Sequence, residues 1–178
     1  QLLTRHQGRM TVADAMAFLR HHAGDENEGW SPAAALFGTD VCMHAGFGPV
    51  RINQSVGSMV SHLTPAGHTH WMTGTSAPCT SIFKPVWLDT GLPALGPQPS
   101  GTYDASTLWW QHEALHRATL RDYAARLPVY RPARDQLEAQ FRDAVVKTSD
   151  AEDRAALTRR CFEEASAATA EWTAAVHT

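Results

Sequence analysis

The 178-residue chain has few cysteines, and they are scattered. The three are Cys42, Cys79 and Cys161, and none of them belongs to a Cys-x-x-Cys pair. This spacing is too open for a disulfide framework and does not predict a zinc site built on sulfur. We therefore expect a reducing, cytoplasmic compartment.

The chain also lacks clustered positive charge and long apolar runs. Fifteen Lys and Arg residues face 18 Asp and Glu residues, which gives a formal net charge of −3. Nucleic acids and anionic membranes are therefore not expected partners. The apolar stretches are far shorter than a membrane span. Apolar residues make up 43% and charged residues 19%, as in an ordinary globular domain with a sizeable core.

Helical patterns lie at both ends of the chain, and strand patterns lie between them. Thr11, with Asp14 three residues later, predicts the start of a helix over residues 12–23. Short apolar runs separated by Pro and Gly predict strands, among them 34–45, 55–63, 69–75 and 81–89. The expected organisation is one domain over 1–178, with helix and loop in 1–30, strands in 31–90, a loop in 91–104 and helices in 105–178.

Three helices are predicted in the last third of the chain. They run from about Ser106 to Ala125, ending before Pro128; from near Pro132; and from the capping box Ser149-x-x-Glu152. The last has an apolar stripe of Leu157, Cys161, Ala165, Ala168, Trp172 and Val176. Because strands precede these helices without alternating with them, the predicted class is α+β.

Residues 108–120, LWWQHEALHRATL, contain the zinc-protease spacing His112-Glu113-x-x-His116. On a helix the two imidazoles share one face, and Glu113 could activate a metal-bound water. However, no further histidine supplies the third ligand, and Arg117 is placed to pair with Glu113 one turn away. We favour a packed helix with two hydrogen-bonded histidines, and a zinc metallopeptidase is the alternative.

Two other groups of residues are candidates for chemistry. Cys42 and His44 could act as nucleophile and base, although a cysteine in an apolar strand is commonly buried and inert. Asn53, Gln54 and Ser55 precede a strand with small side chains, and their amides and hydroxyl could bind a substrate carboxylate or oxyanion. A polar turn into a strand explains those three residues equally well.

Four blocks in the middle of the chain carry a family resemblance. DVCMHAG, QSVGSMVSHL, HWMTGTSAPCTSIFKPVW and LWWQHEALHR resemble, in this order, the C-terminal half of secernin-type proteins. These are cysteine dipeptidases of the N-terminal-nucleophile (Ntn) hydrolase superfamily. The resemblance implies an αββα sandwich of antiparallel sheets, here followed by C-terminal helices. It also implies hydrolysis of small amide or dipeptide bonds through an acyl-enzyme on an N-terminal cysteine.

The nucleophile implied by this resemblance has no counterpart in the chain. Residue 1 is Gln, and none of the three cysteines matches the nucleophile position. We therefore expect a C-terminal portion that contains no catalytic residue, needs no cofactor and is inactive alone. Its expected partners are the missing N-terminal half, a small peptide or amide substrate, and a second copy in a homo-oligomer, because half a sandwich exposes a sheet. A non-catalytic secernin-like interaction module is a further alternative.

Overall fold

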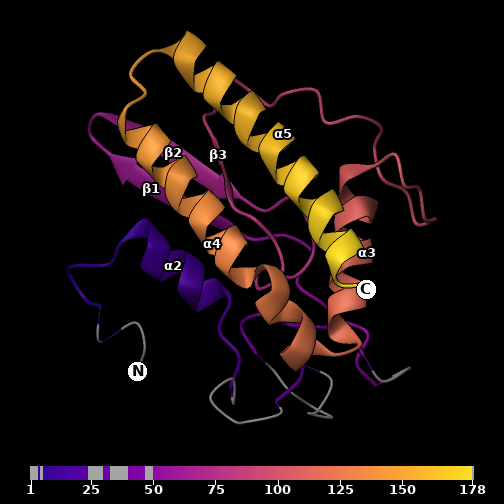
Figure 1. Ribbon diagram of the computed structural model, residues 1–178. Coiled ribbons are helices and arrows are strands. Elements are labelled where there is room, and N and C mark those ends of the chain that lie inside the picture. Colours follow the sequence, from indigo (N-terminus) through magenta and orange to yellow (C-terminus); the bar gives the residue numbers. More distant parts are fainter. Residues whose placement is uncertain (1–3, 5, 24–29, 33–39, 47–49, 178) are drawn as a thin grey trace.

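Figure 1 presents a computed structural model with an α+β fold, as the sequence predicts. It describes residues 4, 6–23, 30–32, 40–46 and 50–177. The elements are α2 (Val12–Leu19), β1 (Met59–Thr64), β2 (Gly67–Met72), β3 (Lys84–Val86), α3 (Leu108–Leu120), α4 (Tyr123–Val146) and α5 (Ala151–Ala175). Within the described ranges, no helix has both the length and the apolar character that a bilayer crossing requires.

The three strands form one antiparallel sheet in the order β1-β2-β3. Strands β1 and β2 are joined by a two-residue turn, with Thr64 opposite Gly67 in the register. Gly67 has a φ of 147°, a value that L side chains rarely adopt. Strand β3 pairs through Trp71 opposite Pro85 and carries the chain from the site loop, residues 76–83, back to the sheet.

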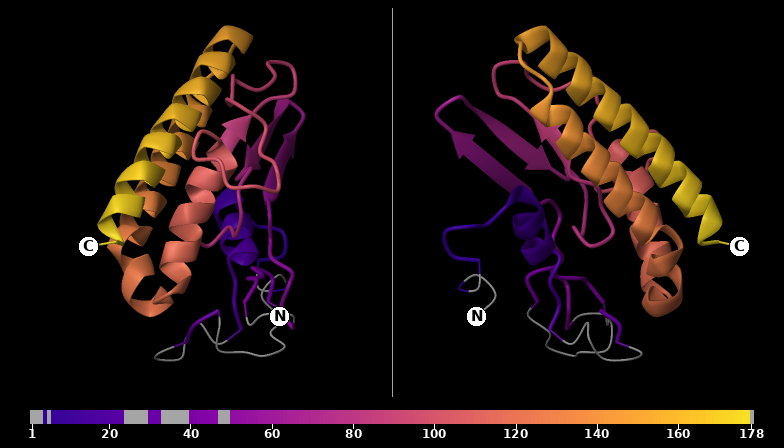
Figure 2. Two further views of the ribbon diagram at one scale, coloured as in Figure 1. Left: turned by 90° about the vertical axis from the view of Figure 1, so that its right-hand side faces the viewer. Right: turned by 60° about the vertical axis from the view of Figure 1, so that its left-hand side comes forward.

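Helices and sheet form two layers. Figures 1 and 2 show α4 and α5 running antiparallel, side by side, with α3 beside them and the sheet on the other side. Strand β3 contacts both α4 and α5, and the short helix α2 contacts β1. The predicted stripe of the last helix is confirmed, because Leu157, Cys161, Ala165, Trp172 and Val176 are buried and Ala168 is partly buried.

The core between the layers contains large aromatic side chains. The ring of Tyr130 on α4 stacks on Trp172 of α5 with 5.2 Å between the ring centroids. The Tyr130 hydroxyl lies 3.0 Å from the Thr119 hydroxyl, so its polar end is satisfied inside the core. Burial of each such side chain stabilises the fold by about 1.5–3 kcal/mol.

The first strand leaves apolar surface exposed. Val56 just before β1 is 61% exposed, and Met59 and Leu63 on the strand are 56% and 64% exposed. Strand β1 is also an edge strand of the described sheet. No other described segment pairs with that edge.

The boundaries of the C-terminal helices correct the prediction. A single helix over Ser106–Ala125 is wrong, because α3 ends at Leu120 and the Asp122 side chain caps α4 by accepting from the Ala125 N–H. The break predicted between Pro128 and Pro132 is also wrong, because α4 continues through both. The two prolines are exposed and one turn apart, so the carbonyls that lose their partners, those of residues 124 and 128, belong to exposed residues.

Three smaller expectations also needed correction. The first helix ends at Leu19, before the predicted 23, and the last is capped by Asp150, not Ser149, through the Asp153 N–H. Residues 40–45 form no strand, and only an isolated bridge from Gly46 to Arg51 follows them. The first part of that predicted strand, residues 34–39, lies outside the described residues.

Candidate functional site

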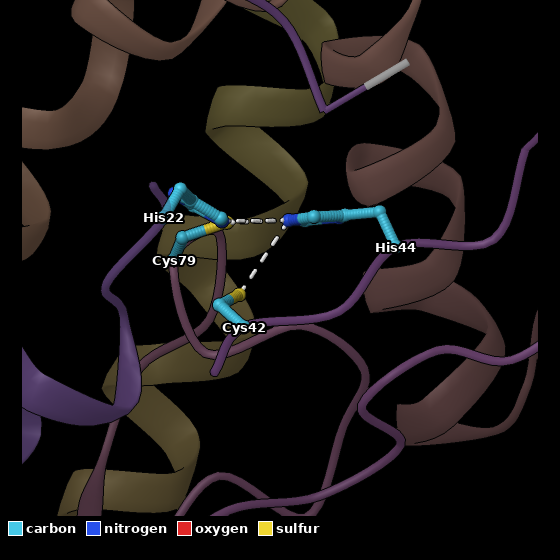
Figure 3. Close-up of side chains that lie close together, drawn as sticks. All are labelled: His22, Cys42, His44 and Cys79. Atoms are coloured by element: carbon cyan, nitrogen blue, oxygen red, sulfur yellow. Dashed lines mark hydrogen bonds between the residues drawn. The ribbon is translucent and has the colours of Figure 1, made fainter. Parts of the chain in front are cut away.

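Four buried side chains from three separate segments meet in the interior of the protein. We call His22, Cys42, His44 and Cys79 the His/Cys centre. Their exposures are 1%, 0%, 2% and 3%, and their candidate ligand atoms all lie within 4.8 Å of one another. In Figure 3 the imidazole of His44 points toward the other three side chains. Among the described residues, this is the only group of three or more possible metal ligands.

The Nε2 atom of His44 has the shortest contacts in the centre. It lies 3.0 Å from Nε2 of His22, 3.3 Å from Sγ of Cys79 and 3.5 Å from Sγ of Cys42. Aromatic rings enclose this side of the molecule, with Trp30 4.6 Å from the His22 ring and Tyr123 in edge contact with both histidines. The four side chains are therefore held together in surroundings that exclude water.

A second set of buried groups contacts the other ring nitrogen of His44, Nδ1. His44 Nδ1 lies 3.0 Å from His116 Nε2, and His116 Nδ1 lies 3.1 Å from Oε2 of Glu113. Glu113 also accepts hydrogen bonds from the Ser76 hydroxyl and, at 2.7 Å, from Nε of Arg117. The i,i+4 ion pair predicted from the sequence is therefore present, and the helix motif reaches the centre through His116.

The direction of these hydrogen bonds follows from the carboxylate. Burial alone would raise the pKa of Glu113, but hydrogen bonds from His116, Ser76 and Arg117 lower it to about 2. An ionised carboxylate only accepts, so His116 donates to Glu113 from Nδ1. When His44 donates from Nδ1 to His116, the lone pair of its Nε2 is directed into the His/Cys centre; in the other tautomer, Nε2 donates to the Cys79 thiolate.

The pKa values of the two thiols in the centre are shifted in opposite directions. Burial opposes ionisation of Cys79, but hydrogen bonds with Cys42, His22 and His44 hold its pKa well below the ordinary thiol value. The hydrogen bond to Cys79 raises the pKa of Cys42, and burial raises it further. The centre therefore stabilises one thiolate beside nitrogen atoms, which is the chemistry of a metal ligand or of a nucleophile.

Charged side chains hold the site loop, residues 76–83, in place. Arg20, at the end of α2, donates to the carbonyl oxygens of Pro78 at 2.8 Å and Ser81 at 3.1 Å. Arg134 of α4 donates to the carbonyl of Cys79, and Glu138 accepts from the Phe83 N–H at 2.8 Å. Arg20 and Glu138 also form an ion pair with each other. The position of Cys79 thus depends on helices far away in the sequence.

The loop also contains an unusual backbone conformation. Ala77 has a φ of 50°, in the left-handed region, and its side chain is completely buried. Its N–H donates to the Ser55 carbonyl at 2.6 Å, and its carbonyl accepts from Thr80. This conformation is uncommon for a residue with a side chain and is disfavoured before a proline. It turns the chain so that Ser76 faces Glu113 while Cys79 joins the centre.

The histidines of the zinc-protease spacing face different partners. Nε2 of His112 lies 3.0 Å from the Ser76 carbonyl and 3.3 Å from the Thr80 hydroxyl. Burial lowers the pKa of His112 to about 3, so the ring is neutral. Both ring nitrogens of His116 are engaged, by Glu113 and by His44. In the described structure His112, Glu113 and His116 thus act as hydrogen-bonding groups.

The predicted substrate-binding residues occupy three different environments. Asn53 is exposed. Gln54 directs its amide toward Oε2 of Glu113 at 3.4 Å, and both residues line a pocket of about 430 Å³ together with Arg51, His116 and Arg117. Ser55 exchanges hydrogen bonds with the backbone of Met43, which ties the segment carrying Cys42 and His44 to the strand region. Only Gln54 and Ser55 are therefore close to the centre.

Sequence reasoning missed His22 and the meeting of Cys42 with Cys79. His22 belongs to no metal-binding spacing, and a histidine near a helix end is favourable without any function. The pairing of the cysteines had no signal in their spacing, because 36 residues separate them. Comparison of the chain with protein-family models and with curated proteins gave no match.

Proposed function

We propose that this chain is the C-terminal part of a cysteine dipeptidase- or amidohydrolase-like protein, which hydrolyses small amide or dipeptide bonds through an acyl-enzyme. One observation carries the proposal. The four blocks that resemble secernin-type proteins, separate in the sequence, converge on one buried site. They contribute Cys42 and His44, Gln54, Ser76 and Cys79, and Glu113 and His116, respectively.

The exposed side of the sheet supports the same proposal. An αββα sandwich places a second sheet against the first and helices outside, and here helices cover one side of a three-stranded antiparallel sheet. Met59 and Leu63 present apolar side chains to solvent on the edge strand. A second sheet from the N-terminal half would bury such surface, which is otherwise unfavourable to expose.

The pocket beside the His/Cys centre is where we place substrate binding by this chain. Arg117 keeps 68% of its side chain exposed while pairing with Glu113. An arginine at a pocket suits the free carboxylate of a dipeptide, and the Gln54 amide can donate to a substrate carbonyl. The N-terminal half would supply the nucleophilic cysteine and its α-amino base. The zinc-peptidase alternative has less support, because both ring nitrogens of His116 are engaged within the protein.

The proposal is tested by comparing the 178-residue chain with a longer form that carries an N-terminal cysteine. Both are assayed by chromatography against a panel of unblocked and C-terminally amidated dipeptides. We expect hydrolysis only by the longer form, with a raised KM for unblocked dipeptides in Arg117→Ala. Full activity of the 178-residue chain alone would contradict the proposal. A longer form that is folded but cleaves no dipeptide would favour the interaction module.

A further inference from the structure

We propose that His22, Cys42, His44 and Cys79 bind one Zn²⁺ ion in a closed, four-ligand structural site. We further propose that Glu113 and His116 are positioning residues that orient His44 toward the metal. This inference does not depend on the proposed hydrolase activity. It rests on the geometry of the His/Cys centre, on the direction of its hydrogen bonds and on its burial.

The distances in the centre match those between the ligands of a tetrahedral zinc ion. Bonds of about 2.0–2.1 Å to nitrogen and about 2.3 Å to sulfur place two nitrogens about 3.3 Å apart, and a nitrogen and a sulfur about 3.6 Å apart. The N–N distance from His22 to His44 is 3.0 Å. The N–S distances from His44 are 3.3 Å to Cys79 and 3.5 Å to Cys42. The other pairs of ligand atoms lie within 4.8 Å of one another, so shifts of about 1 Å or less would place all four around one ion.

The hydrogen bonds around His44 prepare it as a ligand. Glu113 accepts from Nδ1 of His116, and a metal bound at Nε2 of His44 would select the tautomer in which His44 donates from Nδ1 to Nε2 of His116. Metal-bound histidines almost always donate their other ring N–H to a carboxylate, a carbonyl or water, which fixes the tautomer and raises the basicity of the ring. Here His116 lies between the ligand His44 and the carboxylate of Glu113, so the carboxylate orients the His44 ring through His116.

The composition of the centre selects the kind of metal. Two sulfur and two nitrogen donors in tetrahedral geometry suit Zn²⁺, whereas Mg²⁺ and Ca²⁺ require oxygen ligands. A set of four protein ligands leaves no open position for water or substrate, as in structural zinc sites. All four side chains are at most 3% exposed, which also opposes a role of Cys42 and His44 as nucleophile and base.

A metal here would join segments that are remote in the sequence. His22 follows α2, Cys42 and His44 belong to the segment before the sheet, and Cys79 lies in the site loop. Because a zinc site does not exist in the unfolded chain, the free energy of metal binding contributes to folding. The ion would thereby fix the site loop and the 40–46 segment against α3, which carries Glu113 and His116.

The first test measures the metal in the wild-type 178-residue chain, purified in a reducing buffer with added zinc. We expect one zinc per chain by mass spectrometry. X-ray absorption at the zinc edge should give two sulfur ligands at about 2.3 Å and two nitrogen ligands at about 2.0 Å. This measurement needs no variant, so it does not depend on whether a ligand substitution folds. Zinc content near zero, a different metal, or a shell of oxygen and nitrogen alone would overturn the proposal.

The second test uses the third cysteine as a matched control. Cys42→Ser and Cys79→Ser should each lose most of the bound zinc. Cys161→Ser should keep it, because Cys161 is equally buried but lies on α5 outside the centre. With Co²⁺ in place of zinc, the wild type and Cys161→Ser should give the visible bands of tetrahedral thiolate coordination. Retention of zinc in both Cys42→Ser and Cys79→Ser would refute the ligand set.

The third test separates positioning from general structure. Glu113→Gln and His116→Asn should weaken zinc affinity by about 10- to 100-fold, measured by competition with a chelator. The cobalt spectrum of these variants should keep its thiolate bands, because all four ligands are present. Gln111→Ala is the control on the same helix and should leave the affinity unchanged, because Gln111 bonds to Ala105 and Ser166, outside the site loop. Equal loss of affinity in all three variants would show that Glu113 and His116 have no specific part in orienting His44.

Discussion

Glu138 on α4 is the residue whose neutralisation should most strongly destabilise the site loop. Its carboxylate is 2% exposed, accepts from the Phe83 N–H at 2.8 Å and pairs with Arg20. The Gln of Glu138→Gln has nearly the same shape and can still accept from Phe83. It removes the negative charge, however, and leaves Arg20, whose side chain is only 14% exposed, without its partner.

Breaking a buried ion pair from one side costs about 3–5 kcal/mol, because the remaining charge stays buried and uncompensated. That is a large part of the about 5–15 kcal/mol that holds a typical domain folded. We expect Glu138→Gln to lower the free energy of unfolding by this amount in urea titrations followed by tryptophan fluorescence. Glu164→Gln is the control, since Glu164 pairs with Arg160 and both side chains are well exposed, at 45% and 58%. Its expected effect is within about 1 kcal/mol.

The zinc centre gives this prediction a second readout. Glu138 and Arg134 hold the loop that carries Cys79, so Glu138→Gln should also speed the removal of zinc by a chelator, while Glu164→Gln should not. A loss of stability below about 1 kcal/mol in Glu138→Gln would refute the reasoning. It would mean that solvent or another cationic partner compensates the charge, and that the loop is held mainly by its backbone contacts.

Three further predictions concern other residues of the site and core. Burial lowers the pKa of His112 to about 3, so protonation of the unfolded chain should reduce stability as the pH falls below 6.5, by about 2 kcal/mol at pH 5. In urea titrations at pH 7 and pH 5, His112→Gln should reduce this slope, and an unchanged slope would contradict the assignment. Ala77→Gly should change the free energy of unfolding by less than about 1 kcal/mol. Ala77→Val should lower it by more than about 2 kcal/mol, since a β-branched residue is strongly disfavoured at positive φ. Equal melting temperatures of the two variants would count against backbone strain at Ala77. Tyr130→Phe should lower the free energy of unfolding by about 1 kcal/mol in urea titrations, because Thr119 keeps its hydrogen bond to the Leu115 carbonyl. A loss above about 3 kcal/mol would mean that the Tyr130 hydroxyl has another essential partner.

Local patterns were sufficient for the elements that depend on local energetics. The capping box at Thr11 and Asp14 is present, and the stripe along the last helix is buried. The two strands around the Pro-Ala turn overlap the predicted ranges, although their ends differ from the prediction by one to four residues, and residues 91–104 form no helix or strand, as predicted. In these segments the periodicity of apolar residues and the turn residues agree with the tertiary packing, so the sequence alone was informative.

Errors arose where tertiary context decides. Proline normally ends a helix, yet Pro128 and Pro132 lie on the solvent side of α4, where the unpaired carbonyls can be hydrated. The His/Cys centre was missed for a related reason. Its members, His22, Cys42 and Cys79, come from three segments, and their meeting depends on the site loop, which α2 and α4 hold from a distance. No spacing rule records such a contact.

The paired prolines of α4 divide that helix into two parts with different local stability. Each proline removes one backbone hydrogen bond, so the turns from Tyr123 to Pro132 can open at a lower free energy than those that follow. Arg134 and Glu138, the side chains that hold the site loop, both lie after Pro132. Amide hydrogen exchange should therefore be faster before Pro132 than after it. Fraying at the start of α4 would then leave the hydrogen bonds of Arg134 and Glu138 to the site loop intact. The prolines thus separate the less stable first turns of α4 from the residues that position Cys79.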